Sequence, residues 1–242
     1  MTFWDHLDEL RASLIRIILA FIFVAICLFP FKGLLFDHFI LAPSQSDFWL
    51  YKLIGADFSL QLVNIEVTTQ FMVHMKMTLL IAAVIIFPYI IFQIWKFIAP
   101  ALYDHEKKAV GGAFLLSSVL FYIGVTVSYF IVTPLMLNFF SGYQVSGAVP
   151  NMFSLSSYIS LFTSMAITFG IVFELPTLVA VLSGLGILTK ESMRKYRRHA
   201  ICAVVVLAAI ITPSGDPFSL AIVALPIYLL YEFSILICRS KK

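Results

Sequence analysis

The chain has 242 residues, of which 61% are hydrophobic and only 12% are charged, and its formal net charge is +3. A soluble domain is typically about 45–50% apolar and about 25% charged, so this composition excludes an ordinary water-soluble protein. The five histidines and three cysteines are scattered without metal-ligand or disulfide spacing. With no phosphate-binding or nucleophile motif either, the sequence excludes most enzyme classes and predicts no metal and no cofactor.

Six apolar segments follow one another along the chain and predict an all-α integral membrane protein. An α-helix needs about 20 apolar residues to cross the hydrocarbon layer, and none of these segments shows the alternation of barrel strands. We expect one six-helix membrane domain over residues 1–242, with short fifth and sixth helices, because the fifth segment reaches only about 20 Å. The expected transmembrane helices cover about 14–31, 71–98, 110–137, 158–182, 200–212 and 218–238.

The distribution of basic residues predicts how the helices are oriented. Thirteen of the 16 Lys and Arg residues lie at the two termini or in alternate connections on the same side. Because positive charge favours the cytoplasmic side, both termini are expected there. The long connection over residues 32–70 then lies outside, and its many aromatic residues predict a cap at the interface between headgroups and hydrocarbon.

One acid interrupts the fourth apolar segment, FGIVFELPTL at residues 169–178. A charge at this depth is costly, so Glu174 is expected to face the bundle interior or water. Pro176 has no N–H and leaves the carbonyl of Val172 without its usual partner, which predicts a kink. Two interpretations remain open: a protonated core glutamate that supports the kink, or a polar point in a substrate groove or proton site.

Four acids lie on the predicted cytoplasmic face, which is otherwise dominated by positive charge. They are Asp8, Glu9, Asp104 and Glu106. A guanidinium binds a carboxylate through a bidentate fork that an ammonium does not reproduce, so these acids suit a ligand that carries arginines. The alternative is that they cap helices or pair with basic neighbours, because surface charges usually have no specific partner.

Five motifs together resemble the TatC family, the multispanning core subunits of the twin-arginine protein translocase. They span nearly the whole chain in the family's order: HLDELR at 6–11, QIWKFIAPALYDHEKK at 93–108, LFYIGVTVSYF at 120–130, FGIVFELP at 169–176, and MRKYRRHA followed by ITPSGDPFS. The resemblance implies a concave bundle of six helices with both termini in the cytoplasm, in agreement with the charge distribution.

The resemblance also implies a signal-peptide site on the cytoplasmic face. In this family, the acid of the first motif and the acid of the first cytoplasmic loop bind the paired arginines of a signal peptide. These positions are Glu9 and Glu106 in this chain. Phe97 and Pro100 would shape the loop, and Arg11 belongs to the same surface.

Further implications concern the bundle interior and the partner surface. Glu174 matches the family's acid in the fourth helix, which favours a polar point in a groove that receives a signal peptide or a partner helix. Where the family commonly has TPPD, this chain reads TPSGD, which makes Asp216 the expected counterpart, with Thr212 opening the turn. Leu220 offers no hydrogen bond on the surface for single-span partners, so contacts there are expected to rest on packing.

The sequence therefore predicts a protein-translocation receptor without enzymatic activity in a bacterial cytoplasmic (inner) membrane. Its expected partners are twin-arginine signal peptides of cargo proteins, single-span TatA/TatB-type subunits and membrane lipids, in an oligomeric complex without nucleic acid. By resemblance, the transmembrane proton gradient drives transport. The alternative is a proton-coupled secondary transporter of small solutes that uses Glu174, against which stand the missing internal repeat and the lack of facing ionisable groups.

Overall fold

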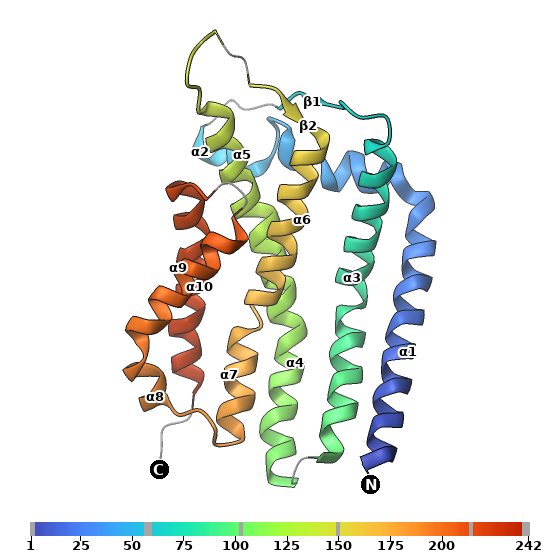
Figure 1. Cartoon of the computed structure of the whole chain (residues 1–242), viewed down its shortest axis with the longest axis vertical. Helices are drawn as coiled ribbons and strands as arrows, with labels where there is room; N and C mark the ends of the chain where they lie inside the picture. The colour runs from blue at the N-terminus through green and yellow to red at the C-terminus, as the bar shows by residue number, and fades with distance from the viewer. Residues whose placement is uncertain (1–2, 56–59, 102–103, 149–150, 213–214, 239–242) are drawn as a thin grey trace.

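A computed structural model describes residues 3–55, 60–101, 104–148, 151–212 and 215–238. Figure 1 shows long helices that run side by side, with the start of α1 (Phe3–Leu28) and the end of α10 (Pro217–Ile237) at the same end. We call this the terminal end, and the opposite end the cap end. Over the described residues, five helical stretches are long and apolar enough to cross a membrane: His6–Phe31, Thr69–Ile98, Gly111–Gly142, Leu155–Gly184 and Pro217–Ile237.

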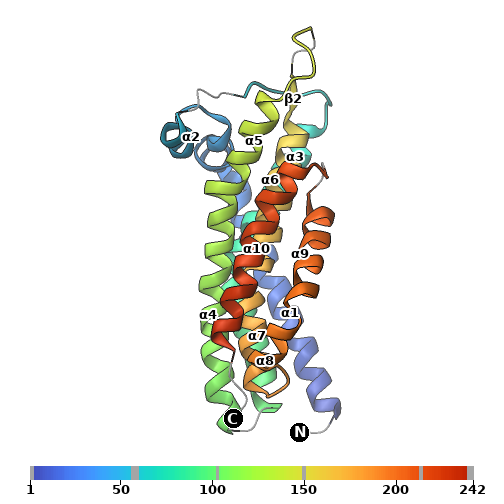
Figure 2. The ribbon, with the colours of Figure 1, turned by 90° about the vertical axis from the view of Figure 1, so that its left-hand side faces the viewer.

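The prediction of a helical membrane protein is confirmed, while the fifth predicted helix differs from the others. Its counterpart α9 (Arg197–Ile211) has 15 residues, so it would reach only about 22 Å. α10 has 21 residues and is the shortest of the five candidate spans, yet it is long enough to cross. The short α8 (Lys190–Lys195) precedes α9, and Figure 2 shows α9 lying beside α10.

Two of the predicted helices are interrupted in the structure. The third begins as α4 (Asp104–Val127), passes through a π-helical stretch, η5 (Ser128–Val132), and continues as α5 (Thr133–Gly142). The fourth consists of α6 (Leu155–Val172) and α7 (Leu175–Gly184). A proline near the start of both α5 and α7 lacks the N–H that a continuous ladder needs, which accounts for the positions of both breaks.

The connection between the first two long helices crosses the cap end (Figure 1). After η1 (Phe29–Phe31) it forms a π-helical segment and three short elements before α3 (Thr69–Ile98) begins. These elements are η2 (Leu34–Ile40), η3 (Ala42–Ser44), α2 (Trp49–Ile54) and strand β1 (Leu62–Val63). β1 pairs in parallel with β2 (Phe153–Ser154), so the fold includes one two-residue strand pair that the all-α prediction did not contain.

Three tyrosines hold this connection in place, one by a bond within the connection and two by bonds from the helices below it. Tyr51 of α2 is fully buried, and its hydroxyl donates to the carbonyl of Pro43 at 2.7 Å. Burial raises the pKa of the Tyr51 phenol, which therefore stays neutral and able to donate. Tyr129 donates to the carbonyl of Phe39 at 2.8 Å, and Tyr158 donates to the carbonyl of Ile40. The cap-end segment is thus held by polar contacts as well as by apolar packing.

The centre of the bundle depends on close contact between α4 and α6. A Cβ on Gly124 would lie 2.4 Å from the carbonyl oxygen of Phe169, and a Cβ on Gly170 would lie 2.6 Å from the Phe121 ring. Only glycine allows this approach, because a methyl group would overlap the facing atoms. This contact fixes the position of the α6–α7 break beside α4.

Candidate functional site

The terminal end brings together two motifs that are far apart in the sequence. The rings of His6 on α1 and Phe97 on α3 stack with centroids 4.2 Å apart and planes inclined by 19°. Glu9 follows His6 by three residues, so both lie on neighbouring positions of the α1 surface that packs on α3. Glu9 is partly buried, whereas Arg11 is exposed on another side of the helix.

The loop after α3 begins with the two residues expected to shape it. α3 ends at Ile98 and is followed by the short 3-10 helix η4 (Ala99–Ala101), in which Pro100 is exposed. Phe97 is partly buried, and its ring stacks on the His6 ring. Pro100 lacks an N–H, which is consistent with the α-helix ending before it.

The start of α4 lies beside the same end of α3. Trp95 of α3 packs on Phe114 of α4, with ring centroids 5.1 Å apart, and a Cβ on Gly111 would come within 3.2 Å of the Trp95 ring. Glu106 belongs to the first turn of α4, and its side chain lies outside the described residues. The backbone thus brings the segments that carry Glu9 and Glu106 to opposite sides of one helix end.

Glu174 lies at the break between α6 and α7, where it contacts α4. The Ser117 hydroxyl donates to Oε2 of Glu174 at 2.6 Å. The second carboxyl oxygen, Oε1, and the hydroxyl of Thr177 are buried and have no hydrogen-bond partner among the described residues. Buried polar groups are normally paired, so this cluster retains capacity for a water molecule or a ligand group.

The break itself follows from the backbone hydrogen bonds around Glu174. The N–H of Glu174 donates to the carbonyl of Ile171 at 3.0 Å, three residues back, and the carbonyl of Glu174 accepts from Leu178 at 2.9 Å. The carbonyl of Val172 has no helical partner because Pro176 stands four residues later. The acid is therefore held at a point where backbone polarity is also exposed within the bundle.

Thr212 and Asp216 end α9 and begin α10. The Thr212 hydroxyl is buried and donates to the carbonyl of Ala208 at 2.9 Å. Oδ1 of Asp216 accepts from the N–H of Ser219 at 2.8 Å, which makes Asp216 the N-cap of α10. Residues 213–214, inside this turn, lie outside the described part of the chain. Leu220 is partly buried against the apolar core between α6 and α10.

The residues described by the structure contain no group of three or more His, Cys, Asp or Glu side chains able to hold a metal ion. At the terminal end the structure places the partly buried Glu9 near the stacked rings of His6 and Phe97 and the turn at Pro100.

A family model described as "Sec-independent protein translocase protein (TatC)" matches residues 5–226. The chain belongs to the TatC family. The predicted family membership is confirmed, and it covers every motif on which the resemblance was based.

TatC relatives match over nearly the full chain. The Sec-independent protein translocase protein TatC of Escherichia coli K12 is 33% identical over 234 residues, covering 97% of this chain and 86% of the relative. The TatC protein of Aquifex aeolicus is 34% identical over 247 residues, covering 100% of this chain and 98% of the relative. A crystal structure titled "Twin Arginine Translocase Receptor- TatC" has a TM-score of 0.77 and 34% identity, covering 96% of this chain and 97% of that chain.

These TatC comparisons give no support to the alternative prediction of a small-solute transporter. The relatives are named as protein translocase components, and the matched structure is named as a receptor. Multi-pass membrane insertion and a place in protein transport follow from the family.

Four polar contacts were not found by sequence reasoning. Ser117, the partner of Glu174, lies 57 residues away on another helix, and only a comparison of depth along both helices would have suggested it. Glu232 accepts from Arg197 at 2.6 Å and from the Tyr228 hydroxyl at 3.0 Å. Lys76 donates to the hydroxyl of Ser160 at 3.4 Å.

Proposed function

We propose that this chain is the receptor and core component of a twin-arginine protein translocase, which binds the signal peptides of folded cargo proteins. The observation that carries the proposal is the stacking of His6 on Phe97, since it joins two family motifs that are about ninety residues apart. The segments that bear Glu9 and Glu106 then flank one end of α3, within reach of a single bound peptide.

The chemistry of Glu9 suits an arginine pair. A partly buried carboxylate is less screened by water than a fully exposed one, and a guanidinium binds it through two parallel hydrogen bonds. A second carboxylate at Glu106 would receive the other arginine, while Phe97 and Pro100 fix the shape of the surface between them. Arg11, exposed on α1, belongs to the same surface.

The rest of the function concerns the membrane and the partner subunits. The terminal end would be cytoplasmic, because the basic residues gather there, and α9 would complete a six-span bundle in a bacterial inner membrane. Exposed apolar side chains on α9 and α10, among them Val206, Ile210 and Leu229, offer packing surface for single-span partner helices. Glu174, with its unpaired oxygen, would meet the inserted peptide or a partner helix, and the proton gradient would drive transport.

The test is binding of a twin-arginine signal peptide to the purified protein, compared with the same peptide carrying two lysines. We expect the lysine peptide to bind at least about tenfold more weakly, because hydrogen bonds to charged groups contribute about 1.5–3 kcal/mol each. Glu9→Gln and Glu106→Gln should each weaken binding of the arginine peptide similarly. The matched control is Glu66→Gln, an exposed acid at the cap end, which should leave binding unchanged.

Two results would contradict this proposal. Equal binding of the arginine and lysine peptides would show that the chain does not recognise the arginine pair. Equal loss in Glu66→Gln and in the two site variants would show that net charge, rather than a specific site, governs binding.

A further inference from the structure

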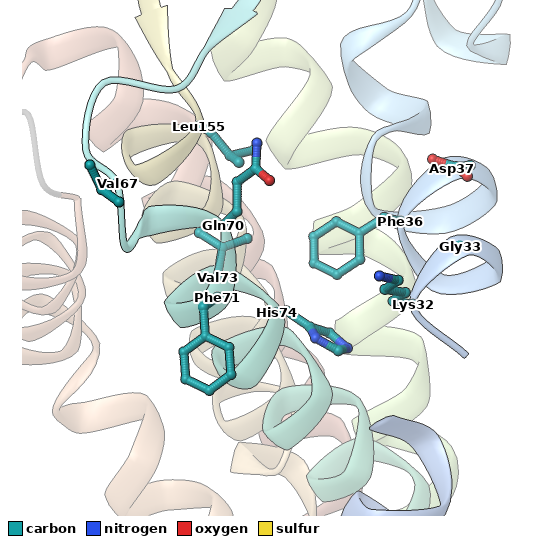
Figure 3. Close-up of a pocket in the computed structure, with 10 residues that line it drawn as sticks. All are labelled: Lys32, Gly33, Phe36, Asp37, Val67, Gln70, Phe71, Val73, His74 and Leu155. Atoms are coloured by element: carbon teal, nitrogen blue, oxygen red, sulfur yellow. The ribbon is translucent and has the colours of Figure 1, made fainter. Parts of the chain in front are cut away.

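A cavity of about 610 Å³ lies at the cap end, between the end of α1 and the first turns of α3. Figure 3 shows its walls, which combine polar and apolar side chains from three separate parts of the chain. The residues that line it are Lys32, Gly33, Phe36, Asp37, Val67, Gln70, Phe71, Val73, His74 and Leu155. The cavity is remote from the terminal end, so it belongs to no part of the proposed signal-peptide site.

Lys32 and His74 are the cationic and donor groups of this cavity, and Figure 3 shows them facing the same space. His74 is held between aromatic rings: Phe29 stacks on it at 4.3 Å, and Phe36 meets it edge-on at 6.0 Å. Its Nε2 is buried without a hydrogen-bond partner among the described residues. No ion pair within the described chain engages Lys32, so its ammonium group has no competing carboxylate there.

Asp37 and Gln70 lie along another edge of the cavity, above Lys32 and His74 in Figure 3. Both side chains are exposed, and Asp37 brings a carboxylate within the same enclosure as the Lys32 ammonium. Lys32 and Asp37 belong to one segment and offer a cation and an anion on the same wall, which suits a ligand that carries both charges. A second negative charge on the ligand would be repelled by Asp37.

A separate apolar groove of about 260 Å³ lies between α1 and α3, and none of the residues that line it also lines the cavity. Phe71 and His74 of the cavity and Met75, Thr78 and Leu79 of the groove follow helical spacing, so they share one face of α3. The opposite wall comes from α1, with Phe21, Ile22, Ala25, Ile26 and Phe29. Phe29 therefore borders the groove and also stacks on His74.

The cavity lies at the depth of the lipid headgroups, and the groove lies at the depth of the acyl chains. The first candidate span ends at Phe31 and the second begins at Thr69, so Lys32 and Gln70 stand at the level of the headgroups. The groove between α1 and α3 lies deeper, at the level of acyl chains. A water-soluble phosphate compound would use the polar cavity and leave the groove empty, whereas a phospholipid would fill both.

We propose that this site binds a phospholipid with a zwitterionic amine headgroup, such as phosphatidylethanolamine. Its phosphate is bound by Lys32 and His74, its ammonium group by Asp37, and one acyl chain lies in the groove between α1 and α3. The inference does not depend on the proposed receptor function, because it rests on different residues at the opposite end.

Native mass spectrometry of the purified protein tests the proposal, with phosphatidylethanolamine and phosphatidylglycerol supplied together. We expect preferential retention of the ethanolamine lipid, and about fivefold weaker retention in Lys32→Gln, because one basic residue near the membrane surface contributes about 1 kcal/mol. Asp37→Asn should abolish the preference for the ethanolamine lipid while phosphatidylglycerol is still retained. The matched controls are Lys52→Gln and Asp47→Asn, an exposed ion pair of 3.1 Å elsewhere in the cap-end segment, and neither should change retention.

Two further experiments distinguish binding of the whole lipid from binding of its soluble headgroup. Ala25→Phe, which fills the groove, should reduce retention of both lipids, and soluble glycerophosphoethanolamine at equal concentration should displace neither. Displacement by the soluble headgroup would overturn the role of the groove. Equal retention of the two lipids by the unchanged protein, or retention that Lys32→Gln leaves intact, would overturn the proposal itself.

Discussion

Removing the Ser117 hydroxyl gives the sharpest test of the polar cluster around Glu174. Ser117→Ala deletes the 2.6 Å hydrogen bond to Oε2. Oε1 already has no hydrogen-bond partner among the described residues. The variant therefore removes the partner of Oε2 as well. The structure therefore predicts a loss of stability larger than that of an ordinary serine substitution.

The expected magnitude comes from hydrogen bonds between membrane helices. Such bonds contribute about 0.6 kcal/mol on average and at most about 1.7 kcal/mol in double-mutant cycles. The short distance places Ser117 near the upper value, so we expect a loss of about 1.5 kcal/mol in the free energy of unfolding. Glu174→Leu in the Ser117→Ala background should recover part of this loss, because both partners are then apolar.

Reversible unfolding in detergent micelles measures this difference, with Ser128→Ala as the matched control. Ser128 is as buried as Ser117, but its hydroxyl has no hydrogen-bond partner among the described residues. Its removal should be neutral or slightly stabilising. If both serine variants change the unfolding free energy by the same amount, the contact with Glu174 does not contribute as argued.

Two further substitutions test the packing of the bundle and the attachment of the cap-end segment. Gly124→Ala places a methyl group 2.4 Å from the Phe169 carbonyl oxygen, and we expect a loss of about 1–3 kcal/mol in unfolding free energy. The control is Gly112→Ala, which has open space around the added methyl group and should cause no loss by overpacking. Equal stability of the two glycine variants would show that the α4–α6 contact is looser than described. Tyr51→Phe removes the buried bond to Pro43 within the cap-end segment and the 3.4 Å bond to the carbonyl of Pro134 in α5. It should cost about 1 kcal/mol in the same assay and speed proteolysis of the cap-end segment, and unchanged proteolysis would contradict its role as an attachment.

The helical course of the chain was largely predictable from composition. Apolar runs of sufficient length must satisfy their backbone hydrogen bonds internally, which leaves helices as the local solution. The extent of α1 was predicted less well, because it begins at Phe3, well before the apolar run expected from residue 14. A helix can continue outside the hydrocarbon where its polar residues still permit helical geometry. Hydropathy therefore does not predict where α1 begins.

The candidate site was also predictable from the sequence only in part. The inward position of Glu174 and the break before Pro176 followed from sequence, because an acid and a proline in an apolar helix have strong local consequences. Its partner Ser117 did not, since a serine in a membrane helix is common and its contact depends on how two helices align. The cavity of Lys32 and His74 was likewise missed, because those residues come from segments that meet only at the cap end.

The sequence by itself determined that this chain is a helical membrane protein of the TatC family, since hydropathy, charge distribution and local motifs act within a few turns of backbone. Only the tertiary structure decided which distant side chains come together: His6 stacks on Phe97, Ser117 donates to Glu174, and Lys32 and His74 line one cavity. The physical reason is that helix formation is governed by neighbours along the chain. Helix alignment depends instead on side-chain packing such as that at Gly124 and Gly170, which no local pattern encodes.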